Sequence, residues 1–394
     1  MNSNYKENLE NLGRVGRLRT LKPLSGRNGC RIVYGGRAML NLTSNDYLGL
    51  AGAKEIHHRF YAGMTDGNIL DNFGLGAASS RLLTGDSDNA HRLEETLRLA
   101  YDREACLLYN SGYHANIGIL PALLGKNDLI LSDKLNHASI MDGMRLSSAQ
   151  HKRYRHCDYD HLEELLATYR NSFERVIIVS ESVFSMDGDV ADLARLADLR
   201  SRFDCLLYVD EAHSIGLYGE KGLGMAEEQG QLARIDLLVG TFGKALASVG
   251  AFLLCSETIR GYLINHSRSL IFTTALPPVV LSWNHFIFKE MLTCHARRRK
   301  LRDLAAALRG ELVRHRLPTD GSTNIVPVMI GEDRLAVVLA EAMQEKGYLI
   351  FPVRPPAVPE GTARFRLSLT ADMAWADLEP VAAHIAELSE RFRS

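Results

Sequence analysis

The stretch LLVGTFGKALASVGAF, residues 237–252, places a lysine between two short apolar runs. The first run, residues 237–239, stops at Gly240, and the second resumes at Ala251, soon after Lys244. Lysines are usually solvated surface charges. Small residues on both sides of Lys244, however, leave room for a bulky group to approach its amine closely. The stretch therefore predicts two buried strands with a candidate functional lysine between them.

The same kind of apolar run recurs through the middle of the chain. The runs lie at residues 106–109, 129–131, 176–179, 206–209, 237–239 and 252–254. Most are separated by stretches of helical periodicity, which predicts an α/β fold with a mostly parallel sheet covered on both faces. Each run ends in polar or small residues. Because ligands of open α/β sheets bind beyond the carboxyl ends of the strands, we expect a site there.

A chain of 394 residues is long enough for one large domain and a smaller one. Residues 1–55 form a polar arm rich in arginine and glycine, and residues 56–276 hold the strand and helix alternation of the large domain. Residues 277–394 carry further apolar runs between two long helical stretches, which predicts a smaller α+β domain.

Composition excludes several classes of protein. A formal net charge of -1 predicts no general attraction to nucleic acid or to an anionic membrane. The N-terminal stretch is polar, without the apolar core of a signal peptide, and no apolar run is long enough to span a bilayer. The six cysteines show no C-x-x-C spacing, so we expect reduced core residues, no metal site and a cytoplasmic protein.

Two familiar motifs are present only in part. Asp210-Glu-Ala-His213 would suit the magnesium-binding strand of a helicase, but no P-loop accompanies it. The loop at residues 74–79 approaches a dinucleotide-binding fingerprint, but serine replaces its third glycine and no clear strand precedes it. Neither reading is kept.

Asp210 and Lys244, each just after a predicted strand, indicate another cofactor. Pyridoxal phosphate (PLP) needs a lysine that binds it covalently and a carboxylate that keeps its ring nitrogen protonated. Its phosphate needs backbone N–H groups or hydroxyls, which the turn at Ser111-Gly112 and the side chain of Thr241 offer. His137, just past another strand end, is a candidate to cover the ring.

Four motifs in one order then carry a resemblance to a known family. They lie at residues 111–116, 182–189, 209–213 and 240–245. They resemble the α-oxoamine synthases, PLP enzymes of fold type I that condense an amino acid with an acyl-CoA and release carbon dioxide. The resemblance extends from about residue 19 to the last helix and implies a large domain with a mostly parallel seven-stranded sheet between helices.

The resemblance implies a role for each matching residue. Lys244 would hold the cofactor covalently, Asp210 would pair with its pyridine nitrogen and His137 would stack on the ring. The remaining cofactor contacts would be His213 and Ser185 near the phenolic oxygen, backbone at Gly112 and Tyr113, the hydroxyl of Thr241, and Thr273 or Thr274 at the neighbouring subunit's phosphate. A homodimer with shared active sites is thus implied.

Residues 353–370 are most similar to the member that joins L-alanine to pimeloyl-CoA, or the pimeloyl-carrier protein, in biotin biosynthesis. Arg366 matches the arginine that binds the amino-acid carboxylate, a bidentate task suited to guanidinium. Arg19 matches a substrate-contacting arginine. Ala357 stands where that member usually carries a threonine that contacts substrate. For Arg364 a structural ion pair is the expected role.

Two alternatives stay open at this point. One is a glycine-using relative, of the glycine C-acetyltransferase or 5-aminolevulinate synthase type. The other is a non-catalytic scaffold of the same fold, which would be expected to lack Lys244 or Asp210, whereas both residues are present.

Overall fold

A computed structural model of the chain describes residues 2–393, which form two compact units. The first unit comprises the N-terminal residues to Ala53, the short segment Ser185–Asp189 and the residues from Ala296 onward. The second unit comprises Lys54–Phe184 and Val190–His295. The sequence-based division differs from this in three respects: residues 277–295 belong with the large unit, the N-terminal arm belongs with the C-terminal unit, and Ser185–Asp189 also belongs with the C-terminal unit.

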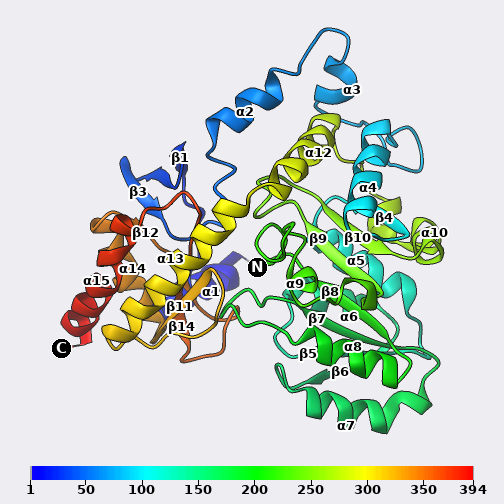
Figure 1. The fold of residues 1–394 in the computed structure, drawn as a ribbon. Helices are drawn as coiled ribbons and strands as arrows, with labels where there is room; N and C mark the ends of the chain where they lie inside the picture. Colours follow the sequence, from blue (N-terminus) through cyan, green and yellow to red (C-terminus); the bar gives the residue numbers. More distant parts are fainter. Residues whose placement is uncertain (1, 394) are drawn as a thin grey trace. The chain divides into compact units, whose positions relative to one another are not determined.

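The second unit is built on a seven-stranded sheet (Figure 1). In spatial order its strands are β4 (Ala105–Tyr109), β10 (Ala251–Cys255), β9 (Leu237–Thr241), β8 (Leu206–Asp210), β7 (Val176–Glu181), β5 (Leu129–Asp133) and β6 (Gln150–Tyr154). Strands β9 to β6 are parallel, and β10 runs antiparallel to both of its neighbours. The expected fold is confirmed, and six of these strands coincide with the apolar runs.

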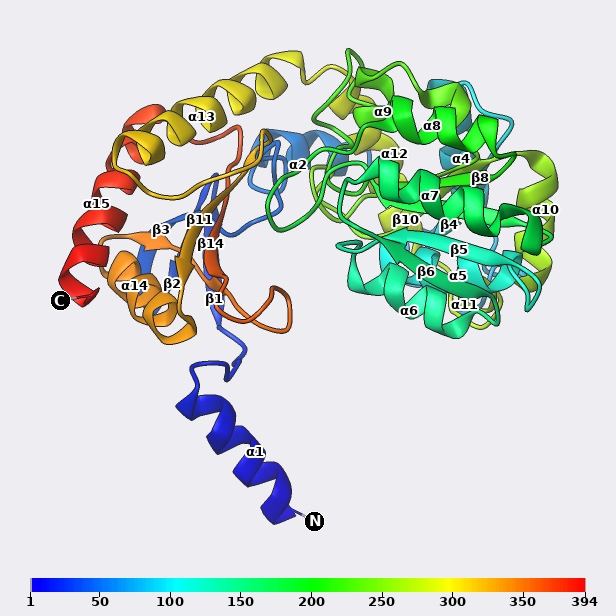
Figure 2. The same ribbon diagram turned by 90° about the horizontal axis from the view of Figure 1, so that it is seen from below.

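Helices cover both faces of this sheet. The helices of the second unit are α2 (Lys54–Tyr61), α3 (Ile69–Phe73), α4 (Asp88–Ala100), α5 (Gly112–Leu123), α6 (Ala138–Leu146), α7 (Tyr159–Tyr169), α8 (Leu193–Arg202), α9 (Met225–Glu228), α10 (Glu257–His266), α11 (Arg268–Ile271) and α12 (Pro278–Leu292). Figure 2 shows α5, α6 and α11 on one face and α4, α8 and α12 on the other. Parallel sheets need this double cover because their strands are apolar on both faces.

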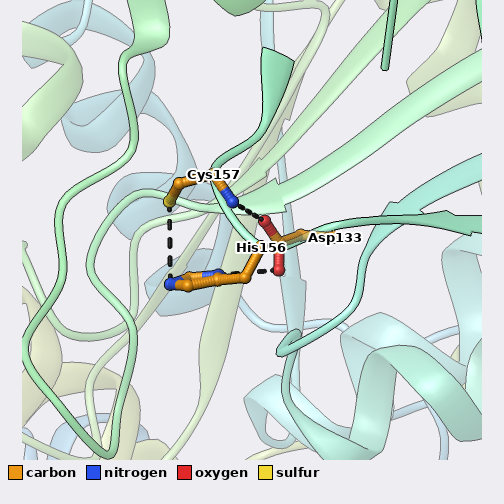
Figure 3. A group of neighbouring side chains, drawn as sticks. All are labelled: Asp133, His156 and Cys157. Carbon is orange, nitrogen blue, oxygen red and sulfur yellow. Dashed lines mark hydrogen bonds and ion pairs between the residues drawn. The ribbon is translucent and has the colours of Figure 1, made fainter. Parts of the chain in front are cut away.

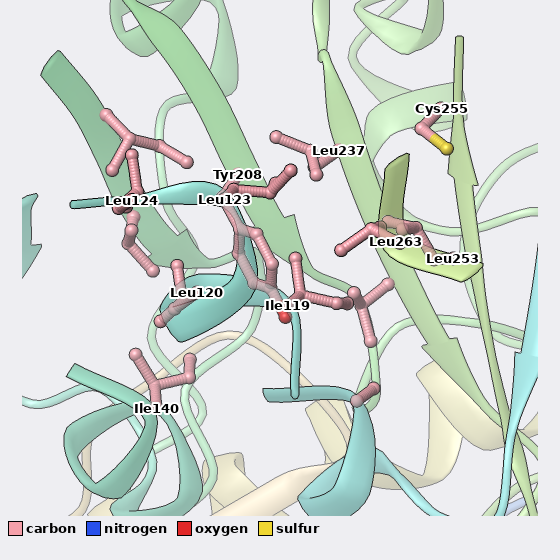
Figure 4. Close-up of a cluster of buried hydrophobic side chains, with 14 of the residues drawn as sticks. Ile119, Leu120, Leu123, Leu124, Ile140, Tyr208, Leu237, Leu253, Cys255 and Leu263 are labelled. Carbon is pink, nitrogen blue, oxygen red and sulfur yellow. The ribbon is translucent and has the colours of Figure 1, made fainter. Parts of the chain in front are cut away.

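The core on the α5 side explains why that helix is apolar nearly all round. Ile119 and Leu120 of α5 are fully buried and lie in one cluster with Tyr208, Leu237 and Leu253 of the sheet (Figure 4). A helix without a polar face is stable only when it is enclosed. This packing fixes the first turn of α5 against the carboxyl ends of the parallel strands.

Helix α12 belongs to the large unit because of its aromatic contacts. Trp283 stacks on His57 with ring centroids 4.8 Å apart, and it meets Phe60 edge-on at 5.0 Å. The helix also packs against α3 and α4. The domain boundary therefore falls after α12 rather than before it.

The first unit contains two small sheets. One joins β1 (Leu24–Asn28), β2 (Arg31–Tyr34), β3 (Arg37–Asn41) and β12 (Tyr348–Leu349), and the other joins β11 (Ile325–Gly331), β14 (Ala363–Ser368) and β13 (Pro352–Val353). Its helices are α1 (Asn2–Arg14), α13 (His295–Arg314), α14 (Asp333–Glu345) and α15 (Trp375–Arg393). Strand β3 pairs with β12, which ties the N-terminal arm to the C-terminal residues and makes this α+β unit discontinuous.

No helix among residues 2–393 combines the length and the apolar character needed to cross a membrane.

Candidate functional site

Asp210 is the last residue of β8 and is buried, with its carboxylate fixed on both oxygens. Oδ2 accepts a hydrogen bond from the side-chain amide of Asn116 at 3.0 Å, and Oδ1 accepts one from the backbone N–H of Ala212 at 2.9 Å. Asn116 is itself held, because its amide also donates to Ser139 at 2.8 Å and its carbonyl accepts from the Tyr208 hydroxyl. The carboxylate thus has a single, pre-set orientation.

A second buried carboxyl, Glu181, ends the neighbouring strand β7 and is paired in register with Asp210. Burial raises the pKa of Glu181 to about 8, and the charge of Asp210 acts in the same direction, whereas Lys244 and a hydrogen bond from the His137 N–H oppose it. Two adjacent buried carboxyls cannot both ionise at low cost. Glu181 is therefore neutral near neutral pH.

His137 lies at the start of α6, beside the same groups. Its backbone N–H donates to Glu181 Oε1 at 2.5 Å, and its ring Nδ1 lies 2.7 Å from the Ser139 hydroxyl. The ring keeps contact with solvent, but the protein packed around it lowers the pKa of the imidazole; Asp210 opposes this and Lys244 reinforces it. A neutral imidazole with an accessible face suits stacking on an aromatic cofactor.

Lys244 is half-buried in the loop that joins β9 to the antiparallel β10. The loop is closed by backbone hydrogen bonds from Phe242 to Gly250 at 3.0 Å and from Ser248 to Phe242 at 2.9 Å. Its charge contributes to the pKa values of both His137 and Glu181. The structure therefore brings Lys244, Asp210 and His137 into one neighbourhood, and their roles toward a cofactor stay predictions.

Helix α12 holds the far side of the lysine loop. The indole N–H of Trp283 donates to the carbonyl of Ala247 at 3.3 Å, and the buried amide of Asn284 donates to that of Val249 at 3.0 Å. Ala247 has φ of 50°, a left-handed conformation that is costly for a residue with a Cβ and persists only where its surroundings enforce it. These contacts position Lys244 through the backbone of its loop.

The first turn of α5 meets the end of β9. A Cβ on Gly112 would lie 2.7 Å from Cγ2 of Thr241, so only glycine allows this approach. The Thr241 hydroxyl is buried and has no hydrogen-bond partner among residues 2–393. A helix N-terminus beside an unpartnered hydroxyl is a site for an anion. This arrangement fits the phosphate of the expected cofactor.

Other predicted contacts border this turn. Tyr113 is exposed and donates its hydroxyl to Asp142 at 2.8 Å. Asn110, directly before the turn, donates its amide to Thr273 Oγ1 at 3.2 Å and to the carbonyl of Thr274 at 2.8 Å. The threonine segment thus lies beside the phosphate turn of the same chain.

His213 and Glu211 follow Asp210. His213 is buried, and Glu211 is fully buried with hydrogen bonds from the Ser182 hydroxyl at 2.7 Å and from backbone N–H groups at the start of α9. Burial raises the pKa of Glu211 to about 7, against these hydrogen bonds. Glu211 braces the turn that carries Asp210 and His213.

In the first unit, Arg366 of β14 has its guanidinium fixed by three acceptors. It donates to the carbonyl of Ser185, to Asn45 Oδ1 at 3.1 Å and to the Tyr47 hydroxyl at 3.0 Å. The predicted substrate arginine thereby also holds the segment that carries Ser185. Arg364, two residues earlier, is buried and forms an ion pair with Asp187, the expected structural role.

Within the first unit, the N-terminal arm contacts the segment that carries Ala357. Arg19 Nη2 donates to the carbonyl of Pro355 at 3.0 Å and lies 3.4 Å from that of Arg354. Ala357 is exposed, with its N–H donating to the Arg354 carbonyl at 3.1 Å. The arm therefore contacts the segment that the sequence associated with substrate choice.

Two residues of the site were missed from sequence. Asn116 stands in the motif of residues 111–116, and Glu181 ends an apolar run at Ser180-Glu181, but neither was assigned a role. The sequence offered one signal for each residue. Asn116 is a polar residue in an otherwise apolar helix, and Glu181 is a carboxyl at the end of a buried strand. Across the described residues one cluster has the spacing for a metal ion, namely Asp133, His156 and Cys157.

The donors of the second unit fit PLP. An oriented carboxylate, a loop lysine, an accessible imidazole and an unfilled hydroxyl at a helix N-terminus converge where the parallel strands end. Fold and site together define an α/β enzyme of fold type I, the class that works with this cofactor.

The chain belongs to the family described as aminotransferase class I and II, whose model matches residues 37–385. It is 52% identical over 372 residues to an 8-amino-7-oxononanoate synthase of Chlorobaculum parvum, covering 94% of this chain and 95% of that protein.

Two solved structures are similar over most of the chain. An 8-amino-7-oxononanoate synthase from Francisella tularensis matches with a TM-score of 0.75 and 27% identity over 90% of this chain and 99% of that one. A serine palmitoyltransferase from S. paucimobilis with a bound PLP-myriocin aldimine matches with a TM-score of 0.89 and 28% identity, covering 98% and 97%. The fold and family expected from the sequence are confirmed.

Proposed function

We propose that this chain is an 8-amino-7-oxononanoate synthase of biotin biosynthesis, which condenses L-alanine with a pimeloyl thioester and releases the thiol and carbon dioxide. The observation that carries the proposal is the 52% identity to the C. parvum synthase over nearly both chains. The predicted enzyme class and cofactor are confirmed by the family and by a PLP-bound neighbour.

PLP, when bound, supplies an electron sink for the negative charge that forms at Cα of the amino acid. Asp210 would hold the proton on the ring nitrogen, because its carboxylate is buried and is fixed on both oxygens. Lys244 would hold the cofactor covalently and, once displaced by L-alanine, its Nζ would take the α-proton.

The other assigned residues would bind and orient. His137 would cover the ring and assist proton transfer, and His213 and Ser185 would contact the phenolic oxygen. The first turn of α5 at Gly112 and Tyr113, with the hydroxyl of Thr241, would take the phosphate. Arg366 would pair with the carboxylate of L-alanine, with Arg19 and Ala357 on the acyl side.

We further propose a cytoplasmic homodimer, with Thr274 of each protomer reaching the phosphate of its partner's site. Six free cysteines suit a reducing compartment. Phe272, beside the threonines, is 70% exposed, and Leu83 and Leu75 are 78% and 87% exposed. Such apolar residues are commonly covered by a partner. Light scattering should give twice the mass of one chain; a monomer with full activity would contradict shared sites.

Release of free thiol from acyl-CoA substrates of increasing length, with L-alanine as co-substrate, tests the function. Pimeloyl-CoA should give the highest kcat/KM, and Lys244→Ala should give none. A preference for glycine with a short acyl-CoA would instead indicate a glycine C-acetyltransferase, and for glycine with succinyl-CoA a 5-aminolevulinate synthase. An absence of turnover together with a failure to bind PLP would indicate a scaffold.

A further inference from the structure

A second group of reactive side chains lies at the edge of the sheet, apart from the residues assigned to the cofactor. Asp133 is the last residue of β5, and His156 and Cys157 follow the end of β6. The two strands are parallel neighbours with Asp133 opposite Tyr154, so the three side chains meet where both strands end. Figure 3 shows the imidazole of His156 between the carboxylate of Asp133 and the thiol of Cys157, with the backbone nitrogen of Cys157 also contacting Asp133.

The distances within this group show how the imidazole ring is oriented. His156 Nδ1 lies 2.9 Å from Asp133 Oδ1, and His156 Nε2 lies 3.7 Å from Cys157 Sγ (Figure 3). A carboxylate at one ring nitrogen holds the proton there and turns the lone pair of the other nitrogen outward. The outward nitrogen is the one that faces the thiol, which is the arrangement of a nucleophile, its base and an orienting group.

The orienting carboxylate is firmly placed. Asp133 has 1% of its side chain exposed, against 23% for His156, and its oxygens also accept hydrogen bonds from the backbone of Leu135 at 2.8 Å and of Cys157 at 2.9 Å. The imidazole packs edge-on against Phe184 with centroids 4.4 Å apart. Both carboxylate oxygens are engaged, so Asp133 is firmly placed to act as a positioning residue for the ring.

A tyrosine hydroxyl lies beside the sulfur. Burial raises the pKa of Tyr159 and a hydrogen bond to Cys157 adds to this, so the tyrosine keeps its proton and can donate it to the sulfur. Cys157 has φ of 49°, a left-handed conformation that the hydrogen bond from its N–H to Asp133 holds in place. Conformations of this kind cluster at functional positions.

We propose that Cys157 is a nucleophilic thiol, activated by His156 and Asp133, and is a covalent modification site for soft carbon electrophiles. His156 Nε2 takes the thiol proton, the sulfur forms a bond to the electrophilic carbon, and the leaving group departs with the bonding electrons. With iodoacetamide as the probe, iodide leaves and the thioether remains.

The test is the alkylation rate of each cysteine in the intact, PLP-loaded protein, followed by peptide mass spectrometry under limiting iodoacetamide at pH 7. Cys30 and Cys294 are half-buried like Cys157 and serve as internal references, of which Cys294 is the stricter because burial raises the pKa of the Cys30 thiol. An ordinary thiol is only a few per cent thiolate at this pH, so an activated one should react about tenfold faster. Reaction of Cys157 at the rate of the references would overturn the proposal.

Two variants separate activation from simple exposure. His156→Gln should bring the rate at Cys157 down to that of the references, and Asp133→Asn should lower it in part. His151→Gln, at an exposed histidine within β6, is the matched control and should change nothing. Loosened structure would raise the rate at all six cysteines, whereas loss of the base lowers it at Cys157 alone. An unchanged rate in His156→Gln would overturn the proposal.

Discussion

The side-chain amide of Asn116 donates a hydrogen bond to the carboxylate of Asp210 across 3.0 Å, from the second turn of α5 to the end of β8. This contact joins the helix that begins at the phosphate turn to the strand that presents the carboxylate. The proposed contacts to the phosphate and to the pyridine nitrogen would therefore be held at a fixed spacing before the cofactor binds, which would reduce the ordering cost of binding.

Asn116→Ala should weaken PLP binding about tenfold or more, because a hydrogen bond to a charged group is worth about 1.5–3 kcal/mol. The melting temperature should also fall, since the Tyr208 hydroxyl loses its acceptor. Titration of PLP into cofactor-free protein measures the affinity. Asn127→Ala removes an exposed amide that contacts Glu174 at 2.8 Å and should leave the affinity intact; equal affinities in the two variants would refute the role of Asn116.

Thr241→Val should lower PLP affinity by about tenfold, the value of one hydrogen bond to a charged phosphate. The stability of the cofactor-free protein should stay the same or rise, because the hydroxyl that is removed is buried without a partner. Thr241→Ser keeps the hydroxyl and should bind PLP nearly as well as the parent. Titration with PLP measures the affinity, and thermal unfolding measures the stability of the cofactor-free protein. Undiminished binding by the valine variant would contradict the phosphate assignment.

Glu181→Gln should change how stability depends on pH. A carboxyl whose pKa is about 8 when folded and ordinary when unfolded binds more protons in the native state, so it makes stability fall as pH rises from about 4.5 to about 8. The neutral amide removes this dependence, which is at most about 1.4 kcal/mol per pH unit. In chemical denaturation of the cofactor-free proteins, the free energy of unfolding of the variant should therefore increase relative to that of the parent as pH rises. A constant difference would mean that Glu181 is already ionised.

Arg366→Lys should raise the KM for L-alanine about 10- to 100-fold, because an ammonium cannot reproduce the bidentate contact. Steady-state kinetics with alanine varied at saturating acyl-CoA measures this. Arg364→Lys is the matched control: its residue is buried in an ion pair with Asp187, so melting temperature should fall while the KM of the folded enzyme holds. The same KM change in both variants would argue against carboxylate binding by Arg366.

Sequence reasoning located the buried strands of the large sheet and missed its edge. Strand β6 reads Gln-His-Lys-Arg-Tyr, and only Tyr154 is buried, so no apolar run marks it. It is a strand because β5 offers it a partner, and charged side chains are common on edge strands. The N-terminal strands escaped for a related reason, since β3 depends on pairing with a two-residue strand far along the chain.

The chemistry of the site could be predicted from sequence where few cofactors require a given residue type at a given position. A lysine amid small residues and a carboxylate after a buried strand suit few cofactors, and both lie where predicted. The roles of Asn116 and Glu181 depend on their neighbours in space. The role of Glu181 depends on the register of β7 against β8, and that of Asn116 depends on which face of α5 lies toward Tyr208. Three-dimensional contacts of this kind leave no local pattern.

The loop between β9 and β10 combines a backbone that is held by hydrogen bonds with a flexible lysine side chain, that of Lys244. Its backbone is cross-linked to itself and clamped by Trp283 and Asn284, so the four methylenes of the side chain supply the mobility. Rotamer changes take picoseconds to nanoseconds, whereas loop rearrangements are slower. The amine can thus change its position while the loop backbone keeps its hydrogen bonds.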